Sequence, residues 1–172
     1  LKMGADTVTN SGRMAVEDDL SEVDQGTCGG TASSRLCGTS NSDSIINSGA
    51  LTVNGDIILG SGITTQGEFK NWSDDDTINN SGTLNVNNIN FEKAQATGAD
   101  ADTLINDGTL SAAANIIFGR DSDALTNTGN LVVTGDIDFG SGNDLFKTGY
   151  NFDVTGVIDG GSGDNDNLKF GE

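Results

Sequence analysis

Aspartate carboxylates are the side chains of this sequence with the clearest capacity for chemistry. Two glycine-rich turns near the C-terminal end bring several of them together. Carboxylate and backbone carbonyl oxygens are the ligands that hard cations such as Ca²⁺ prefer. The sequence therefore predicts two candidate calcium groups: Asp136, Asp138 and Asp144, or Asp164 and Asp166. The alternative is that these acids form only a solvated acidic surface.

A second candidate site surrounds Trp72, the only tryptophan. Asp74, Asp75 and Asp76 follow it closely. An aromatic ring beside carboxylates is suited to contact with a sugar or to binding a cation. The competing interpretation is that Trp72 folds back over the edge of the fold.

Two cysteines, Cys28 and Cys37, lie in a segment rich in Gly, Ser and Thr. Their spacing allows a disulfide that closes a small surface loop, which implies an oxidising compartment. A zinc site is not expected, because two thiolates in a chain without histidine leave the metal short of ligands.

The charge balance limits the partners that the chain can have. Eight basic and 26 acidic residues give a net charge of −18, which disfavours nucleic acids and anionic membranes. No apolar run approaches the length of a membrane span. Without histidine there is no Ser/His/Asp or Cys/His constellation, so catalysis is not expected. Paired carboxylates acting on a polysaccharide are the enzymatic alternative.

These residues belong to a repeat, and the repeat predicts the elements that position them. An aspartate opens each of six units: Asp6, Asp43, Asp76, Asp102, Asp123 and Asp144. Four residues later stands an asparagine in five units: Asn10, Asn47, Asn80, Asn106 and Asn127. A glycine follows two residues further on in the same five units. The shortest units are 21 residues long, too short for a pair of helices and sufficient for one three-sided coil.

Apolar residues recur two, eight, ten, fourteen and sixteen positions after the opening aspartate, with one residue deleted in the third unit. Spacing by two is the periodicity of strands whose alternate side chains point inward. The sequence therefore predicts an all-β parallel β-helix (β-solenoid) of about six coils, each with three short strands. Like residues would stack in columns at the strand spacing of about 4.8 Å. The asparagines would form a ladder of side-chain amides, serve as turn residues in the left-handed region, or do both.

Residues 47–53 (NSGALTV) and 80–86 (NSGTLNV) resemble the repeats of bacterial autotransporter passengers and filamentous-haemagglutinin-type adhesins. The resemblance covers nearly the whole chain and implies a right-handed parallel β-helix on or outside the cell surface. The turns at residues 139–144 and 160–166 resemble, more distantly, the calcium-binding repeats of toxins. They depart from that motif in a missing first glycine and in Asn165, which stands where an aspartate is expected.

Three units are longer than 21 residues. Their extra residues predict a binding surface on this single domain of residues 1–172. The units that open at Asp6, Asp43 and Asp76 are 37, 33 and 26 residues long. Their extra residues, at about 21–42, 60–75 and 92–101, all follow the third strand and should leave the coil at one corner. Insertions aligned on one face of a solenoid often form its binding face.

Together these observations predict a non-catalytic, extracellular structural or adhesive module of a bacterial surface protein. Neither end of the repeat shows a cap, so the coils either stack head to tail into a fibre or continue in a longer chain. Host or matrix glycans are the expected external ligands. The alternatives are a polysaccharide-binding or polysaccharide-degrading β-helix and a calcium-binding surface-layer module.

Overall fold

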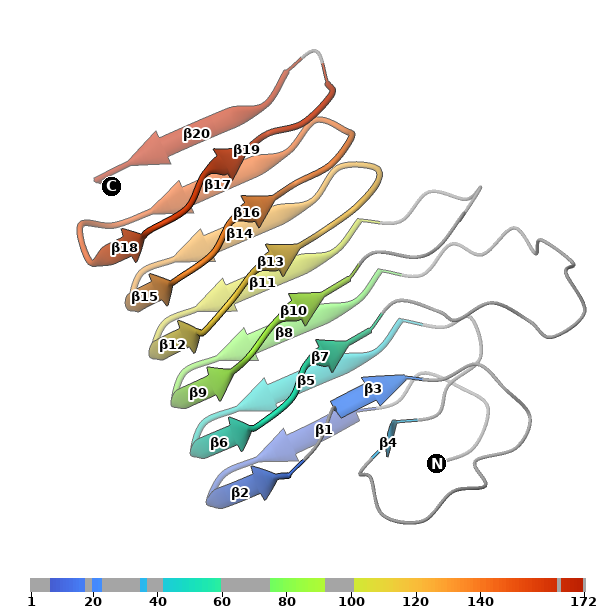
Figure 1. The fold of residues 1–172 in the computed structure, drawn as a ribbon, viewed down its shortest axis with the longest axis vertical. Coiled ribbons are helices and arrows are strands. Elements are labelled where there is room, and N and C mark those ends of the chain that lie inside the picture. The colour runs from blue at the N-terminus through green and yellow to red at the C-terminus, as the bar shows by residue number, and fades with distance from the viewer. Residues whose placement is uncertain are drawn as a thin grey trace, which may run out of the picture.

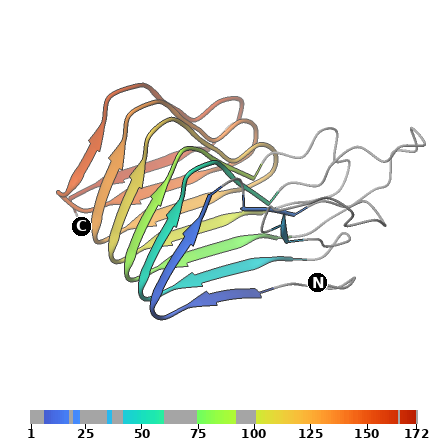
Figure 2. The same ribbon diagram turned by 60° about the horizontal axis from the view of Figure 1, so that its bottom comes forward.

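The computed structural model describes residues 7–17, 20–22, 35–36, 42–59, 75–91, 101–163 and 165–171. Within these residues every regular element is a β-strand, and every strand pair is parallel. The strands form three sheets stacked along one axis, from blue to red in Figure 1. Figure 2 shows the chain running from one sheet to the next before it begins the coil above. The predicted fold class, an all-β parallel β-helix, is therefore confirmed.

Each coil from β1–β3 to β17–β19 contributes one strand to each sheet, and β4 and β20 are additional strands of sheets C and A. Sheet A contains, in order, β1 (Thr7–Asn10), β5 (Ser44–Asn47), β8 (Thr77–Asn80), β11 (Thr103–Asn106), β14 (Ala124–Asn127), β17 (Leu145–Thr148) and β20 (Asn167–Phe170). Sheet B contains β2 (Arg13–Val16), β6 (Ala50–Val53), β9 (Thr83–Val86), β12 (Thr109–Ala112), β15 (Asn130–Val133) and β18 (Phe152–Val154). Sheet C contains β4 (Arg35–Leu36), β3 (Leu20–Glu22), β7 (Ile57–Ile58), β10 (Ile89–Asn90), β13 (Ile116–Ile117), β16 (Ile137–Asp138) and β19 (Ile158–Asp159).

The strand register places equivalent residues of successive units directly above one another. Leu110, for example, pairs with Leu84 on one side and Leu131 on the other, and all three are fully buried. Ile89 pairs with both Ile57 and Ile116, which confirms the one-residue deletion inferred for the third unit. Side chains alternate between inward and outward along each strand. Successive coils must therefore pair without a shift, because a slip by one residue would turn every apolar side chain of a strand outward.

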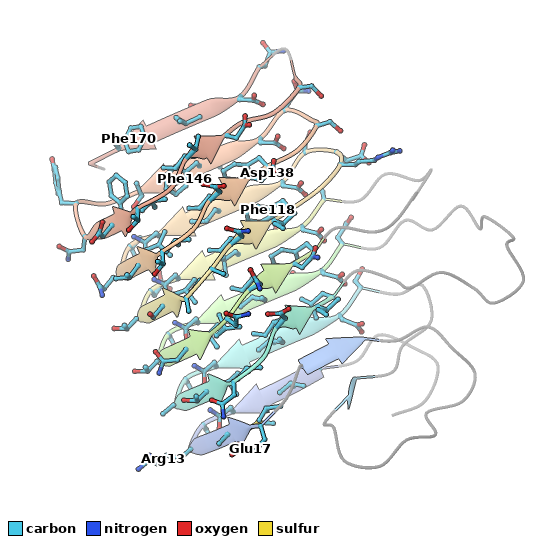
Figure 3. All side chains as sticks on the ribbon, viewed as in Figure 1. Arg13, Glu17, Phe118, Asp138, Phe146 and Phe170 are labelled. Carbon is cyan, nitrogen blue, oxygen red and sulfur yellow. The ribbon has the colours of Figure 1, made fainter. Side chains whose placement is uncertain are left out.

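The core changes from aliphatic to aromatic toward the C-terminal end. Phe91, Phe118 and Phe139 stack face to face, with ring centroids 5.1 and 4.8 Å apart. Above them Phe146 makes edge contacts with Phe152 and Phe170. Figure 3 shows Phe118 and Phe146 between the sheets, whereas Arg13 points away from the stack. Phe170 itself, on the last strand of sheet A, is 51% exposed.

Sheet C includes a strand that the repeat does not predict. The strand β4 lies within the expected insertion at residues 21–42, and it pairs with β3 through Ser21 and Arg35. It therefore adds a rung beside β3, at the edge of the sheet. The repeat contains no signal for this strand, since β4 occupies none of the recurring positions.

Glycines between sheets A and B are required because the backbones of adjacent coils approach closely. A Cβ atom at Gly49, Gly82, Gly108 or Gly129 would collide with the carbonyl oxygen of the equivalent glycine in the preceding coil. Gly12, in the first described coil, has no atom within 4 Å of that position. Lack of space therefore explains the recurring glycine at the four upper positions.

We expect Gly108→Ala to lower the free energy of unfolding by about 2 kcal/mol, because the added methyl group forces two coils apart. Gly12→Ala is the matched control and should change it by less than about 0.5 kcal/mol. Urea unfolding followed by circular dichroism measures both variants. Equal effects of the two substitutions would contradict the close-approach explanation.

Candidate functional site

The asparagines form a continuous ladder at the corner between sheets A and B. Each Nδ2 donates to the Oδ1 of the next asparagine over 2.7 to 2.8 Å, in the order Asn10, Asn47, Asn80, Asn106 and Asn127. Several Nδ2 atoms also donate to main-chain carbonyls, as Asn106 does to Asn130 O at 3.0 Å. All five side chains are buried. The predicted amide ladder is confirmed.

A threonine ends this ladder. Nδ2 of Asn127 donates to Oγ1 of Thr148, and that hydroxyl in turn donates to the carbonyl of Gly149. A hydroxyl has one proton and here directs it back to the main chain. Phe170, which is in register above Thr148, therefore covers no amide in need of a partner.

Five of the opening aspartates, together with Asp166, form a second column at the corner that leads into sheet A. The main-chain N–H of each aspartate donates to Oδ1 of the next one, at 2.8 to 3.0 Å, along Asp43, Asp76, Asp102, Asp123, Asp144 and Asp166. The first five side chains are at most 3% exposed. We refer to these six residues as the aspartate column. Its Oδ1 atoms satisfy the N–H groups that begin each coil.

Burial and stacking create an electrostatic conflict in this column. Residues in adjacent rungs are about 4.8 Å apart, and two unit charges at that distance repel by about 3 kcal/mol at an effective dielectric constant of 20. Burial raises the pKa of the Asp144 carboxyl above its usual value, the hydrogen bond from Asp123 N–H lowers it, and the charge of Asp166 raises it. The second oxygen of Asp144, Oδ2, is buried without a hydrogen-bond partner.

A third ladder lies at the corner between sheets B and C. Here the side chain of one coil accepts an N–H from the coil above: Asn88 N donates to Asp56 Oδ1, Asn115 N to Asn88 Oδ1, Asp136 N to Asn115 Oδ1 and Val157 N to Asp136 Oδ1. The donor distances are 2.7 to 3.1 Å. All three corners of the coil are thus held by polar side chains that bridge successive rungs.

The residues of the two predicted calcium groups occupy different corners. Asp144 and Asp166 are neighbours in the aspartate column, and Asp136 belongs to the third ladder. Oδ1 of Asp138 accepts the N–H of Gly140, which has a positive φ of 78°, so this carboxylate stabilises a tight turn. Asp164 lies outside the described residues. Among the residues that the structure describes, no three His, Cys, Asp or Glu side chains are grouped to hold a metal ion, and calcium binding stays a prediction.

The other predicted sites fall mostly outside the described ranges. Trp72, Asp74, Cys28 and Cys37 lie there, so the disulfide and the aromatic contact stay predictions. Asp75 is exposed, and its Oδ1 accepts the N–H of Ala101 at 3.0 Å.

Asp76 is fully buried in the aspartate column. Its Oδ1 accepts the N–H of Asp43, so the carboxylate links two successive coils.

The sequence pattern did not lead us to predict the aspartate column or the third ladder, although the residues of both recur at regular positions in the sequence. The opening aspartate recurs in every unit, and an Asp or Asn recurs 13 positions later at Asp56, Asn115 and Asp136. An alternating apolar pattern identifies strands, but it does not show that a polar side chain at a corner bonds to the coil above or below.

Three parallel sheets with ladders at every corner define the class of this protein as a parallel β-helix. Comparison of the chain with protein-family models, curated proteins and solved structures finds no match to any of them. In the described part of the chain, no helix is long and apolar enough to cross a membrane.

We expect Asn106→Ala to lower the free energy of unfolding by about 3 kcal/mol, because it removes two buried hydrogen bonds and one partly buried one, and leaves Asn127 Oδ1 without its donor. Asn79→Ala, on the outer side of β8, is the control and should have little effect. Chemical denaturation compares the two. A small effect of Asn106→Ala would mean that the amide ladder contributes little to stability.

Proposed function

We propose that this chain is a non-catalytic structural and adhesive module of an extracellular bacterial surface protein. The proposal is supported by the parallel β-helix itself and by the resemblance of residues 47–53 and 80–86 to repeats of surface adhesins. A stack held by backbone pairing and side-chain ladders makes a rod with long, regular outer faces. Such faces suit contact with an extended partner.

The observation that carries the proposal is the outer side of sheet A. On β1, β5, β8, β11 and β14 the first and third residues face outward, and they are Thr7, Thr9, Ser44, Ile46, Thr77, Asn79, Thr103, Ile105, Ala124 and Thr126. We call these ten residues the uncharged face. It carries no charged side chain, although the chain has 26 acidic residues. The first charges on this side are Lys147 and Lys169 on β17 and β20.

The uncharged face fits a neutral, hydroxyl-rich polymer such as an uncharged polysaccharide. Its threonine hydroxyls both donate and accept hydrogen bonds, and a net charge of −18 repels polyanions. Five strands of four residues span roughly 24 by 13 Å. That area, about 300 Å², is well below the roughly 800 Å² per partner of a stable protein pair. A narrow chain lying along the stack therefore suits this face better than a globular partner.

We expect the protein to co-sediment with an insoluble neutral polysaccharide such as cellulose, and less with a polyuronate gel. Thr103→Asp places a charge on β11, within the uncharged face, and should weaken binding roughly tenfold, because the contact would desolvate that charge. Ser111→Asp, at an outward position of sheet B in the same coil, is the matched control. Equal effects of the two substitutions, or preference for the charged gel, would contradict this ligand class.

Association with a second copy at the ends of the stack is the other part of the proposal. At the C-terminal end Val157, Leu168 and Phe170 are 63%, 46% and 51% exposed. Among the residues that the structure describes, β20 pairs with β17 alone and is the edge strand of sheet A. A strand of a second copy could add to that edge and cover Leu168 and Phe170. Such a head-to-tail contact is heterologous, so its product would be a fibre.

We expect self-association to increase with salt concentration, because screening reduces repulsion between chains of net charge −18. Leu168→Asp should abolish it, whereas Ile46→Asp, at a residue that is 42% exposed on the uncharged face, should not. Sedimentation velocity across a salt series measures both variants. A chain that stays monomeric at high salt would leave neighbouring coils of a longer chain as the partner of this end.

A further inference from the structure

The two ends of the stack differ in which sheet carries an additional strand. Sheets A and C each contain seven described strands, whereas sheet B contains six. The last strand of sheet A is β20, at the C-terminal end, and the additional strand of sheet C is β4, at the N-terminal end. Figure 1 shows β20 next to β17 and, at the opposite end, β4 next to β3. Each end of the described stack therefore projects by one rung, but in a different sheet.

These projections fit each other when a second copy continues the stack. If β1 of the next copy lies on β20, sheet A continues without a gap. The same placement sets β4 of the next copy directly on β19, because both sheets then repeat after seven rungs. At a rung spacing of about 4.8 Å, the offset between copies is roughly 34 Å. A closer approach would put β1 and β20 on the same rung, so sheets A and C select one common offset.

Sheet A supplies the larger part of this junction. In its register, Val8 of the next copy lies on Leu168. Val8 packs against the core and is partly buried, whereas Leu168 is 46% exposed. The contact therefore continues an apolar column across the junction. On the outer side Thr9 of the next copy lies beside Lys169, so no like charges face each other in this sheet.

The asparagine ladder is closed on both sides of the junction. At its first rung, Asn10 Nδ2 donates to Asn47, and Asn10 Oδ1 accepts the N–H of Gly12 at 3.2 Å. At its last rung, the hydroxyl of Thr148 turns back to the main chain. Phe170 is the residue that lies opposite Asn10 of the next copy. It therefore interrupts no hydrogen bond of the ladder.

In sheet C the junction brings residues of opposite formal charge to adjacent rungs. Asp138 and Asp159 are in register on the last two strands, so this column ends in two acidic residues. The pairing of β4 with β3 assigns Arg35 to the same column at the N-terminal end. In the next copy Arg35 therefore takes the position that follows Asp159. A basic residue beside acidic residues favours this pairing of strands.

We propose that two copies join through a composite coil, in which β20 of one copy supplies the strand of sheet A and β4 of the next copy supplies the strand of sheet C. Sheet B has no additional strand at either end among the described residues, so one of its rungs stays open between β18 and β2. The inference rests on the end-to-end association proposed above and specifies its register. Four residues of β20 and two of β4 make a small contact, so the association is weak and reversible.

Cross-linking between copies tests the register in sheet A. In a chain that carries Cys28→Ser and Cys37→Ser, the substitutions Thr9→Cys and Lys169→Cys place thiols on adjacent rungs across the junction. A thiol cross-linker that spans about 5 Å should then join copies into a ladder of covalent oligomers, because this length matches one rung.

The matched control is in sheet B. Ala15→Cys and Asp153→Cys, in the same cysteine-free background, place thiols in one column of that sheet. The open rung separates them by two rungs, about 10 Å, so the same cross-linker should not join them. Equal yields from the two pairs, or association without a product from the sheet A pair, would show that the composite coil is wrong.

Sedimentation velocity of the same variants separates this inference from the proposed function. Chains that associate but cross-link through another register leave the end-to-end association in place and overturn only the composite coil. Chains that stay monomeric at high salt overturn both.

The contact in sheet C has a separate test. Asp159→Asn removes the charge and keeps an oxygen that can accept the N–H of Gly161, whereas Asp153→Asn makes the same change in net charge beside the open rung. At the lowest salt concentration at which the unmodified chain associates, the association constant of Asp159→Asn should be roughly threefold lower than that of Asp153→Asn. Equal constants would mean that β4 takes no part in the junction, and the composite coil would be wrong.

Discussion

In-register stacking of parallel strands is the constraint on which the rest of this structure depends. Each residue of a coil meets the equivalent residue of the next coil at about 4.8 Å, so a side chain must be compatible with a copy of itself above and below. Aliphatic side chains meet this requirement by filling the interior in columns, as Leu84, Leu110 and Leu131 do. Glycine meets it at Gly82 and Gly108, where the backbones leave no room for a Cβ atom.

The same constraint has opposite consequences for amides and carboxylates. A stacked asparagine donates upward and accepts from below, so each added rung satisfies the one before it. A stacked aspartate satisfies a main-chain N–H with one oxygen and places like charges in adjacent rungs. Thr148 shows how the amide ladder can stop, since its hydroxyl turns back to Gly149 and lets Phe170 cover it. The aspartate column continues to Asp166 without such an ending.

Charge is distributed unevenly over the coil, and this distribution links the fold to the proposed function. Acidic residues collect at the corners, where ladders and tight turns use their oxygens, as at Asp136 and Asp138. The outer side of sheet A is left uncharged over five strands. In the proposed function, this neutral, hydroxyl-rich side is the surface that a neutral polymer approaches.

The sequence by itself determined the fold class, the strand positions, the apolar columns and the asparagine ladder, because each follows from a local period of two repeated in every unit. It also identified the deletion that places Ile89 under Ile116. Only the tertiary structure decided how the corner residues are used. It assigned the opening aspartates to a buried column, Asp56 and Asn115 to a third ladder, and β4 to the edge of sheet C. The physical reason is that a polar side chain at a corner can bond to the coil above, to the coil below or to water, and these alternatives share the same sequence spacing. They differ only in which atoms the stacked backbone brings within hydrogen-bonding distance.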